Sequence, residues 1–187
     1  MNRQLLNRWH NSEELAQHGL PDIVHQWLGG SGSMTRAMRS LTDDQLALQL
    51  LSSEHQLVSE DEASLLGHGS AQSLLTREVL MQQDNEPLLY GRSIFPDSLA
   101  TDALATIESL GTKPLGDILF QLSDEPRLSM QYAMLDEQTY LYQALNKHIP
   151  QSEPLYARRS IFQYQQQRIL VQEVFLSSHP VYALINC

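Results

Sequence analysis

Residues 73–81, Ser-Leu-Leu-Thr-Arg-Glu-Val-Leu-Met, decide the fold because they alternate between a mainly apolar and a mainly polar face, as a half-buried strand does. The apolar face carries Leu75, Val79 and Met81, and the charged Arg77 lies among them. An unpaired charge on such a face is costly. Arg77 therefore indicates either a buried ion pair or a pocket for a ligand with charged oxygens.

A carboxylate stands in a similar place near the other end of the chain. Residues 169–175 read Ile-Leu-Val-Gln-Glu-Val-Phe, so that Glu173 shares a face with Ile169, Val171 and Phe175. Arg77 and Glu173 could pair with each other inside the fold, or each could bind one end of a charged ligand. The pattern by itself leaves both interpretations open.

Extended runs come in pairs joined by turn-like segments. Residues 73–82 and 87–95 flank Gln-Asp-Asn-Glu at 83–86, and residues 156–164 and 168–176 flank Gln165-Gln166-Gln167. A further alternating run covers residues 128–134. Strands that arrive as hairpins form antiparallel sheets, so we expect an α+β fold with a single antiparallel β-sheet and helices packed on one face.

Helix signals fall between these runs. We expect a short helix over 21–28 that is closed by Gly29-Gly30, and another that begins after the N-cap Ser33. Further helices are expected over 101–110 and 114–119, and a helical or irregular stretch over 136–149. Residues 45–58 are ambiguous, because alternating leucines favour a strand whereas Gln-Leu-Ala-Leu-Gln-Leu-Leu has high helix propensity.

Composition limits the classes of function. The 187 residues are expected to form one domain (1–187) with a helical N-terminal segment (1–40), and we expect a monomer. With 12 basic and 22 acidic residues the net charge is −10, which argues against binding to nucleic acid or anionic lipid. No apolar run approaches the roughly 18 residues of a membrane span. The single cysteine, Cys187, allows no internal disulfide, so we expect a cytoplasmic protein without a signal peptide.

Several local motifs predict no special chemistry. The segment Gly29–Ser33 lacks the preceding strand and following Gly-Lys of a phosphate loop, and the seven histidines lack metal-binding spacing, so no metal site is expected. The acidic residues 60–62 are interpreted as a solvated loop, and Arg158 and Arg159 as a solvated strand edge.

Seven short segments, taken in order, carry a more specific signal. They are Ser-Met-Thr at 33–35, Leu-Thr-Arg-Glu-Val-Leu at 75–80, Gly-Arg-Ser-Ile-Phe-Pro at 91–96, Leu-Gly-Thr-Lys-Pro-Leu-Gly-Asp-Ile-Leu-Phe at 110–120, Ala-Arg-Arg-Ser at 157–160, Gln-Glu-Val-Phe-Leu at 172–176 and Pro-Val-Tyr at 180–182. Together they resemble the chorismate pyruvate-lyase (4-hydroxybenzoate synthase) family. The resemblance implies a carbon–oxygen lyase that eliminates pyruvate from chorismate to give 4-hydroxybenzoate, the first step of ubiquinone biosynthesis, without a cofactor. It also implies an antiparallel sheet whose ligand is buried under helical flaps.

The resemblance assigns product contacts to Met34, Arg77, Leu115 and Glu173. Arg77 would bind the ring carboxylate with its two-pronged guanidinium, and Glu173 would accept a hydrogen bond from the ring hydroxyl and assist removal of the proton. These two are the expected catalytic residues. Leu115 would donate its backbone N–H, and Met34 would form an apolar wall. Arg92 is a candidate contact for the second carboxylate of chorismate.

Two alternatives remain at this stage. Met34 and Leu115 could be ordinary core residues. The whole chain could instead be a non-catalytic domain of the same fold that binds an aromatic acid, as the ligand-binding domains of some transcription regulators do. Residues 1–40 contain no basic recognition helix, which argues against a DNA-binding regulator.

Overall fold

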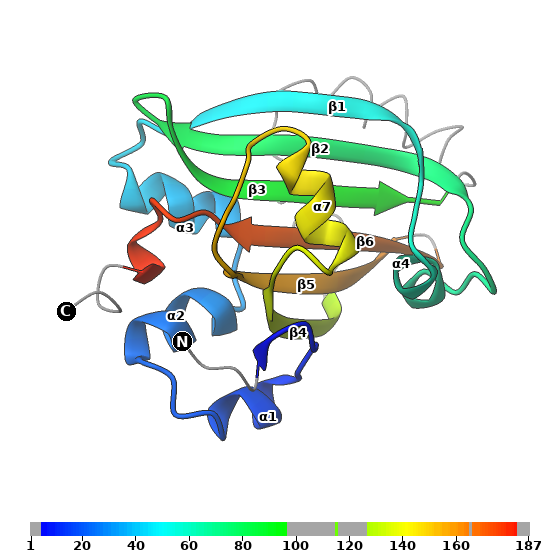
Figure 1. Ribbon diagram of the computed structural model, residues 1–187, viewed down its shortest axis with the longest axis horizontal. Helices are drawn as coiled ribbons and strands as arrows, with labels where there is room; N and C mark the ends of the chain where they lie inside the picture. Colours follow the sequence, from blue (N-terminus) through cyan, green and yellow to red (C-terminus); the bar gives the residue numbers. More distant parts are fainter. Residues whose placement is uncertain (1–4, 97–114, 116–126, 165, 183–187) are drawn as a thin grey trace.

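The computed structural model describes residues 5–96, 115, 127–164 and 166–182, and this part of the chain contains a six-stranded antiparallel sheet (Figure 1). The strands lie in the order β1-β2-β3-β6-β5-β4. Their bounds are β1 Ala47–Leu57, β2 Ser73–Gln83, β3 Glu86–Phe95, β4 Arg127–Leu135, β5 Leu155–Tyr164 and β6 Gln167–Phe175. The helical elements are α1 Ser12–Ala16, α2 Asp22–Gly29, α3 Met34–Leu41, α4 Glu60–Leu65, α7 Tyr140–Asn146 and the 3-10 turn η3 Pro180–Tyr182. The α+β class and the antiparallel sheet are confirmed.

Both predicted hairpins form. Strands β2 and β3 meet at Asp84 and Asn85, whose φ angles of 51° and 65° lie in the left-handed region that these two residue types tolerate. Two successive left-handed residues give the turn whose twist matches a right-handed strand pair. Strands β5 and β6 pair up to Tyr164 and Gln167, so the chain turns within the predicted glutamine segment, but Gln167 already belongs to β6 and the turn is one residue shorter than expected.

The ambiguous segment over 45–58 forms strand β1 at the edge of the sheet, paired with β2 along its length. One extra residue between Leu50 and Ser52 makes a bulge in β1. Pairing with β2 supplies hydrogen bonds along one edge of the segment, and this tertiary contact prevails over local helix propensity.

The helices near the N-terminus follow their predicted caps. Helix α2 begins after Pro21, and Ser33 caps α3 by accepting a hydrogen bond from the backbone N–H of Arg36 at 3.4 Å. The acidic residues 60–62, expected to form a solvated loop, are instead the first turn of α4. Ser59 and Glu62 form a capping box there, and only 2% of Glu62 is exposed.

Helices cover both faces of the sheet, rather than one as expected. Helices α2 and α3 pack against the face that carries Met81 and Leu89. Helix α7 packs against the opposite face, where it crosses in front of the sheet in Figure 1, and α4 covers the end of that same face. The second face is also apolar, through side chains such as Tyr90 and Val174, and an apolar face must be covered.

The helices expected over 101–110 and 114–119 lie outside the described residues except at Leu115, which is helical and buried. Within the described part of the chain, no helix is long and apolar enough to cross a membrane.

Candidate active site

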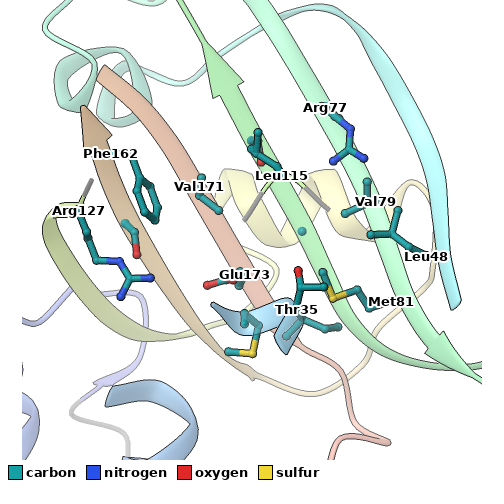
Figure 2. Close-up of a pocket in the computed structure, with 15 residues that line it drawn as sticks. Thr35, Leu48, Arg77, Val79, Met81, Leu115, Arg127, Phe162, Val171 and Glu173 are labelled. Atoms are coloured by element: carbon teal, nitrogen blue, oxygen red, sulfur yellow. The ribbon is translucent and has the colours of Figure 1, made fainter. Parts of the chain in front are cut away.

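A pocket opens on the sheet face that α3 covers, and strands from β1 to β6 line it (Figure 2). Its lining is mostly apolar with a few polar groups, which is typical of a site for a small organic ligand. The lining residues are Met34, Thr35, Leu48, Arg77, Val79, Met81, Leu89, Gly91, Ser93, Leu115, Arg127, Ser160, Phe162, Val171 and Glu173.

Strand register explains why residues far apart in sequence meet here. Directly paired residues form two adjacent rows across the sheet, both facing the pocket. The first row is Arg77, Ser93, Val171 and Ser160; the second is Val79, Gly91, Glu173 and Arg158. A Cβ at Gly91 would lie 3.0 Å from Cγ2 of Val79, so the glycine keeps the pocket floor open beside Glu173.

Arg77 lies in the pocket wall on β2 and is 3% exposed (Figure 2). Burial lowers the pKa of its guanidinium from the ordinary value, but an arginine keeps its proton in proteins. The alternation in the sequence therefore placed Arg77 on the correct face. The structure brings it into the pocket as a buried cation.

Glu173 has a structural partner, Arg158, directly opposite on β5. The Nε of Arg158 donates to one carboxylate oxygen of Glu173, and Nη2 donates to the other at 3.3 Å. Nη1 of Arg158 donates to the carbonyl of Gly30 at 2.9 Å, so the same guanidinium also holds the segment that leads into α3. Arg158 is 1% exposed, and the expectation of a solvated edge was wrong.

The sequence left open whether Arg77 and Glu173 pair with each other or bind separate ends of a ligand, and the Arg158 pairing bears on that choice. Glu173 forms an ion pair with Arg158, whereas Arg77 lies at a separate place in the pocket, two strands away (Figure 2). Arg158 compensates the buried charge of Glu173 from the side of β5. The carboxylate still lines the pocket, with a side-chain exposure of 12%.

Arg127, which the sequence reasoning did not select, brings a second cation to the pocket wall. It begins β4, stacks on Phe162 with its guanidinium carbon 5.1 Å from the ring centre, and donates to the carbonyl of Ser31 at 2.6 Å. Burial lowers its pKa most, the nearby charge of Arg158 lowers it further, and Glu173 opposes both. Figure 2 shows Arg127 and Arg77 on opposite sides of the pocket with Glu173 between them.

Met34 and Leu115 both line the pocket, as expected for ligand contacts. Met34 is the first residue of α3 and is 5% exposed, and Leu115 is 6% exposed. Both also belong to apolar clusters, so each residue lines the pocket and packs in the core at the same time.

Arg92 does not lie in this pocket. It follows Gly91 on β3 and therefore points to the opposite face, where it is fully buried. There Nε binds a carboxylate oxygen of Glu62 at 3.2 Å and Nη1 binds Glu78 at 2.8 Å. The expectation that Arg92 contacts a second carboxylate in the pocket was wrong, because an adjacent residue on a strand faces the other way.

Arg159 was also wrongly interpreted as solvated, since it is 6% exposed. Its guanidinium lies over the ring of Trp9, 4.3 Å from the ring centre, and binds Gln131 and Asp61 on the face opposite the pocket. This arrangement is structural.

The pocket also contains a polar group without a partner. Ser160 is 2% exposed, and its Oγ has no hydrogen-bond partner in the part of the chain that the structure describes. Among these same residues, no group of three or more histidine, cysteine or carboxylate side chains is arranged to hold a metal ion.

Sequence reasoning did not select Arg158 or Arg127 for the site, and the sequence carries only a partial signal for them. The observed pairing of Tyr164 with Gln167 sets Arg158 opposite Glu173, whereas the predicted turn over three glutamines shifts the register by one residue and sets Arg158 opposite Val174. Arg127 could not be found in this way. One extra residue between Arg127 and Ser129 interrupts the pairing with β5, and such a bulge reverses the faces predicted by simple alternation.

The fold has relatives among solved structures. The effector domain of PhnF from Mycobacterium smegmatis superposes with a TM-score of 0.53 at 15% identity, covering 79% of this chain and 90% of that one. The C-terminal domain of the histidine utilization repressor from Pseudomonas syringae gives a TM-score of 0.52 at 12% identity, covering 72% and 93%. At such low identity these similarities concern the fold alone.

Sequence relatives are closer and cover nearly the whole chain. A probable chorismate pyruvate-lyase from Methylobacillus flagellatus is 32% identical over 181 residues, which is 96% of this chain and 98% of that protein. The chorismate pyruvate-lyase of Photorhabdus laumondii is 32% identical over 166 residues, covering 87% and 86%. The family model for chorismate lyase matches residues 5–185. The chain therefore belongs to the chorismate lyase family.

Proposed function

We propose that the pocket between Arg77 and Glu173 is the site at which this chain eliminates pyruvate from chorismate and forms 4-hydroxybenzoate. As a member of the chorismate lyase family the chain is a chorismate pyruvate-lyase, which is a carbon–oxygen lyase. The observation that carries the site assignment is the placement of a buried cation and a carboxylate at separate points of one apolar pocket.

The strand order sets Arg77 and Glu173 far enough apart to bind opposite ends of a six-membered ring. Arg77 on β2 and Glu173 on β6 are two strand spacings apart, about 10 Å across the sheet. In this proposal Arg77 binds the ring carboxylate through paired N–H donors, and Glu173 accepts a hydrogen bond from the ring hydroxyl at the other end. The backbone N–H of Leu115 adds a donor, and Met34 packs against the ring.

The reaction itself needs little chemical assistance. The ether bond between the ring and the enolpyruvyl group breaks, the hydroxyl-bearing carbon loses a proton, and the leaving enolpyruvate takes up a proton to become pyruvate. Because the ring becomes aromatic, the step has a large driving force. We propose that Glu173 positions the ring and assists removal of that proton, and that no cofactor takes part.

The cellular setting is part of the proposal. The product would supply ubiquinone biosynthesis, and the enzyme would act as a single-domain monomer in the cytoplasm. The acidic chain is not expected to bind nucleic acid, and its arginines attract the anionic substrate only locally.

The direct test is to incubate the purified chain with chorismate, with a metal chelator present, and to measure 4-hydroxybenzoate and pyruvate together. We expect equal amounts of both. Arg77→Ala should abolish turnover, and Arg77→Lys should restore little of it because an ammonium cannot make the two-pronged contact. A wild-type chain that binds 4-hydroxybenzoate but forms no product would contradict the lyase assignment and favour the non-catalytic aromatic-acid-binding domain.

A further inference from the structure

The substrate of the proposed reaction carries two carboxylates, and the roles proposed for Arg77 and Glu173 account for only one of them. The enolpyruvyl ether is attached to the ring carbon next to the one that bears the hydroxyl. If Arg77 binds the ring carboxylate and Glu173 the hydroxyl, the second carboxylate must emerge beside Glu173, on the side away from Arg77. Strands β5 and β4 lie beyond Glu173 on that side and can supply a group that recognises it.

Arg127 lies on that side of the pocket. It lines the wall at the start of β4, opposite Arg77, with Glu173 between the two (Figure 2). The ring of Phe162 and the carbonyl of Ser31 hold its guanidinium in place. A guanidinium carries five N–H donors in a fixed fork, so contact with a backbone carbonyl is compatible with binding a carboxylate.

Ser160 adds a neutral donor on β5, two residues from Phe162, the ring on which Arg127 stacks. Ser160 is 2% exposed and lines the same pocket. Its hydroxyl has no hydrogen-bond partner among the described residues. A buried hydroxyl without a hydrogen bond is costly, and native structures rarely tolerate one. An oxygen of a bound ligand would satisfy it.

The charges of the pocket agree with a ligand that carries two negative charges. Its charged lining residues among those described are Arg77, Arg127 and Glu173, and Glu173 is already paired with Arg158. Arg77 and Arg127 place positive charge on opposite walls of the pocket. Chorismate presents one carboxylate to each, whereas 4-hydroxybenzoate has a single carboxylate and leaves one cation unused.

We propose that Arg127 and Ser160 form the subsite that binds the enolpyruvyl carboxylate of chorismate and, after the ether bond breaks, the carboxylate of pyruvate. This inference rests on the proposed function. The subsite distinguishes chorismate from 4-hydroxybenzoate, because 4-hydroxybenzoate has no enolpyruvyl carboxylate and makes no contact with it.

The test compares two ligands across three variants: Arg127→Gln, Ser160→Ala and the control Arg168→Gln, which removes an exposed arginine from β6 outside the pocket. For each variant, kcat/KM for chorismate is measured beside the calorimetric Kd for 4-hydroxybenzoate. Losing a hydrogen bond to a charged group should lower kcat/KM on the order of 10- to 100-fold in Arg127→Gln and about tenfold in Ser160→Ala. The Kd for 4-hydroxybenzoate should stay within about threefold, and the control should change neither quantity.

A purely structural role for Arg127 predicts a different result. Arg127 also holds the segment that leads to Met34, so in that case turnover and 4-hydroxybenzoate binding would weaken by the same factor in Arg127→Gln. Equal losses for both ligands, or an unchanged kcat/KM in both pocket variants, would overturn the subsite.

Failure of the proposed function would be recognised separately. If the wild-type chain forms no product, chorismate persists in the calorimeter and its own Kd replaces kcat/KM in the same comparison. The subsite then stands if Arg127→Gln weakens chorismate selectively, and falls if it does not.

Discussion

Glu173 has two roles at the level of a single residue, because one carboxylate faces a ligand pocket and pairs with a buried arginine at the same time. Arg158 orients the carboxylate through two N–H groups and binds the carbonyl of Gly30 with a third. Removing either charge alone leaves the other buried without its counterion, which is more costly than removing both.

The first prediction follows from this asymmetry. Arg158→Gln should lower the free energy of unfolding by about 3–5 kcal/mol, because the charge of Glu173 is left without its partner. Adding Glu173→Gln should recover a substantial part of that loss, yet the double variant should remain inactive toward chorismate because the carboxylate is gone. Urea unfolding and the product assay measure the two effects. Additive losses of stability in the double variant would mean that the two residues do not depend on each other.

At the scale of an element, β3 separates the pocket from a buried network of charges by simple alternation. Gly91 faces the pocket, and Arg92 faces the other side, where it joins Glu62 and Glu78. Burial alone would raise the pKa of Glu78, but hydrogen bonds from Tyr90 and neighbouring groups, together with the charge of Arg92, outweigh burial and lower it. This buried network connects α4 to the sheet.

The second prediction tests this separation. Arg92→Gln should lower the free energy of unfolding by about 3–5 kcal/mol, since Glu62 and Glu78 lose their cation. In the folded variant, KM for chorismate and Kd for 4-hydroxybenzoate should stay close to the wild-type values. A tenfold rise in KM with unchanged stability would instead mean that Arg92 contacts the substrate.

The same elements show how far sequence reasoning reaches. Alternation placed Arg77 and Glu173 on the pocket face, and the turn residues located both hairpins, because these are local properties of a strand. The partners of the buried charges lie far from them in the sequence, so local patterns did not reveal them. Arg158 depended on a hairpin register that the predicted three-glutamine turn misses by one residue. Arg127 depended on an unpredicted bulge, and Glu62 on a capping box in a segment predicted to be a loop. The roles of Met34 and Leu115 came from the family resemblance, not from pattern.

At the scale of the whole molecule, His179 packs between helix α2, near the start of the chain, and strand β6, near its end. It is 1% exposed, and its ring lies 4.4 Å from the ring of Trp27 on α2 and 4.9 Å from that of Phe175 on β6, between ring centres. Its Nδ1 accepts a hydrogen bond from the backbone N–H of Val181 at 3.0 Å. Burial lowers the pKa of His179 to about 4 from its ordinary 6.5.

The third prediction is an acid-dependent loss of stability. Between about pH 6.5 and pH 4 the unfolded chain binds a proton at His179 that the folded chain does not, so stability falls as the pH drops through this range. The shift corresponds to about 2 kcal/mol between pH 7.5 and pH 5. Glu78, with a lowered pKa, loses its stabilising effect only at lower pH.

His179→Asn isolates the contribution of the imidazole to the pH dependence, because the asparagine side-chain oxygen can still accept the hydrogen bond from the backbone N–H of Val181. The variant should be less stable at every pH, but its stability should change less between pH 7.5 and pH 5 than that of the wild type. Replacing the exposed His55 by Asn is the matched control. An identical pH dependence in wild type and His179→Asn would remove His179 from the account.

The central claim is that Arg77 and Glu173 bind opposite ends of one aromatic ring, and the most direct measurement is calorimetric binding of 4-hydroxybenzoate and benzoate to the wild type and to Glu173→Ala. The two acids differ only in the hydroxyl, so any shared effect of the substitution on the fold cancels in the comparison. We predict that Glu173→Ala weakens 4-hydroxybenzoate by about 1–3 kcal/mol more than benzoate, the scale of a hydrogen bond to a charged group. Equal losses for the two acids would contradict the claim.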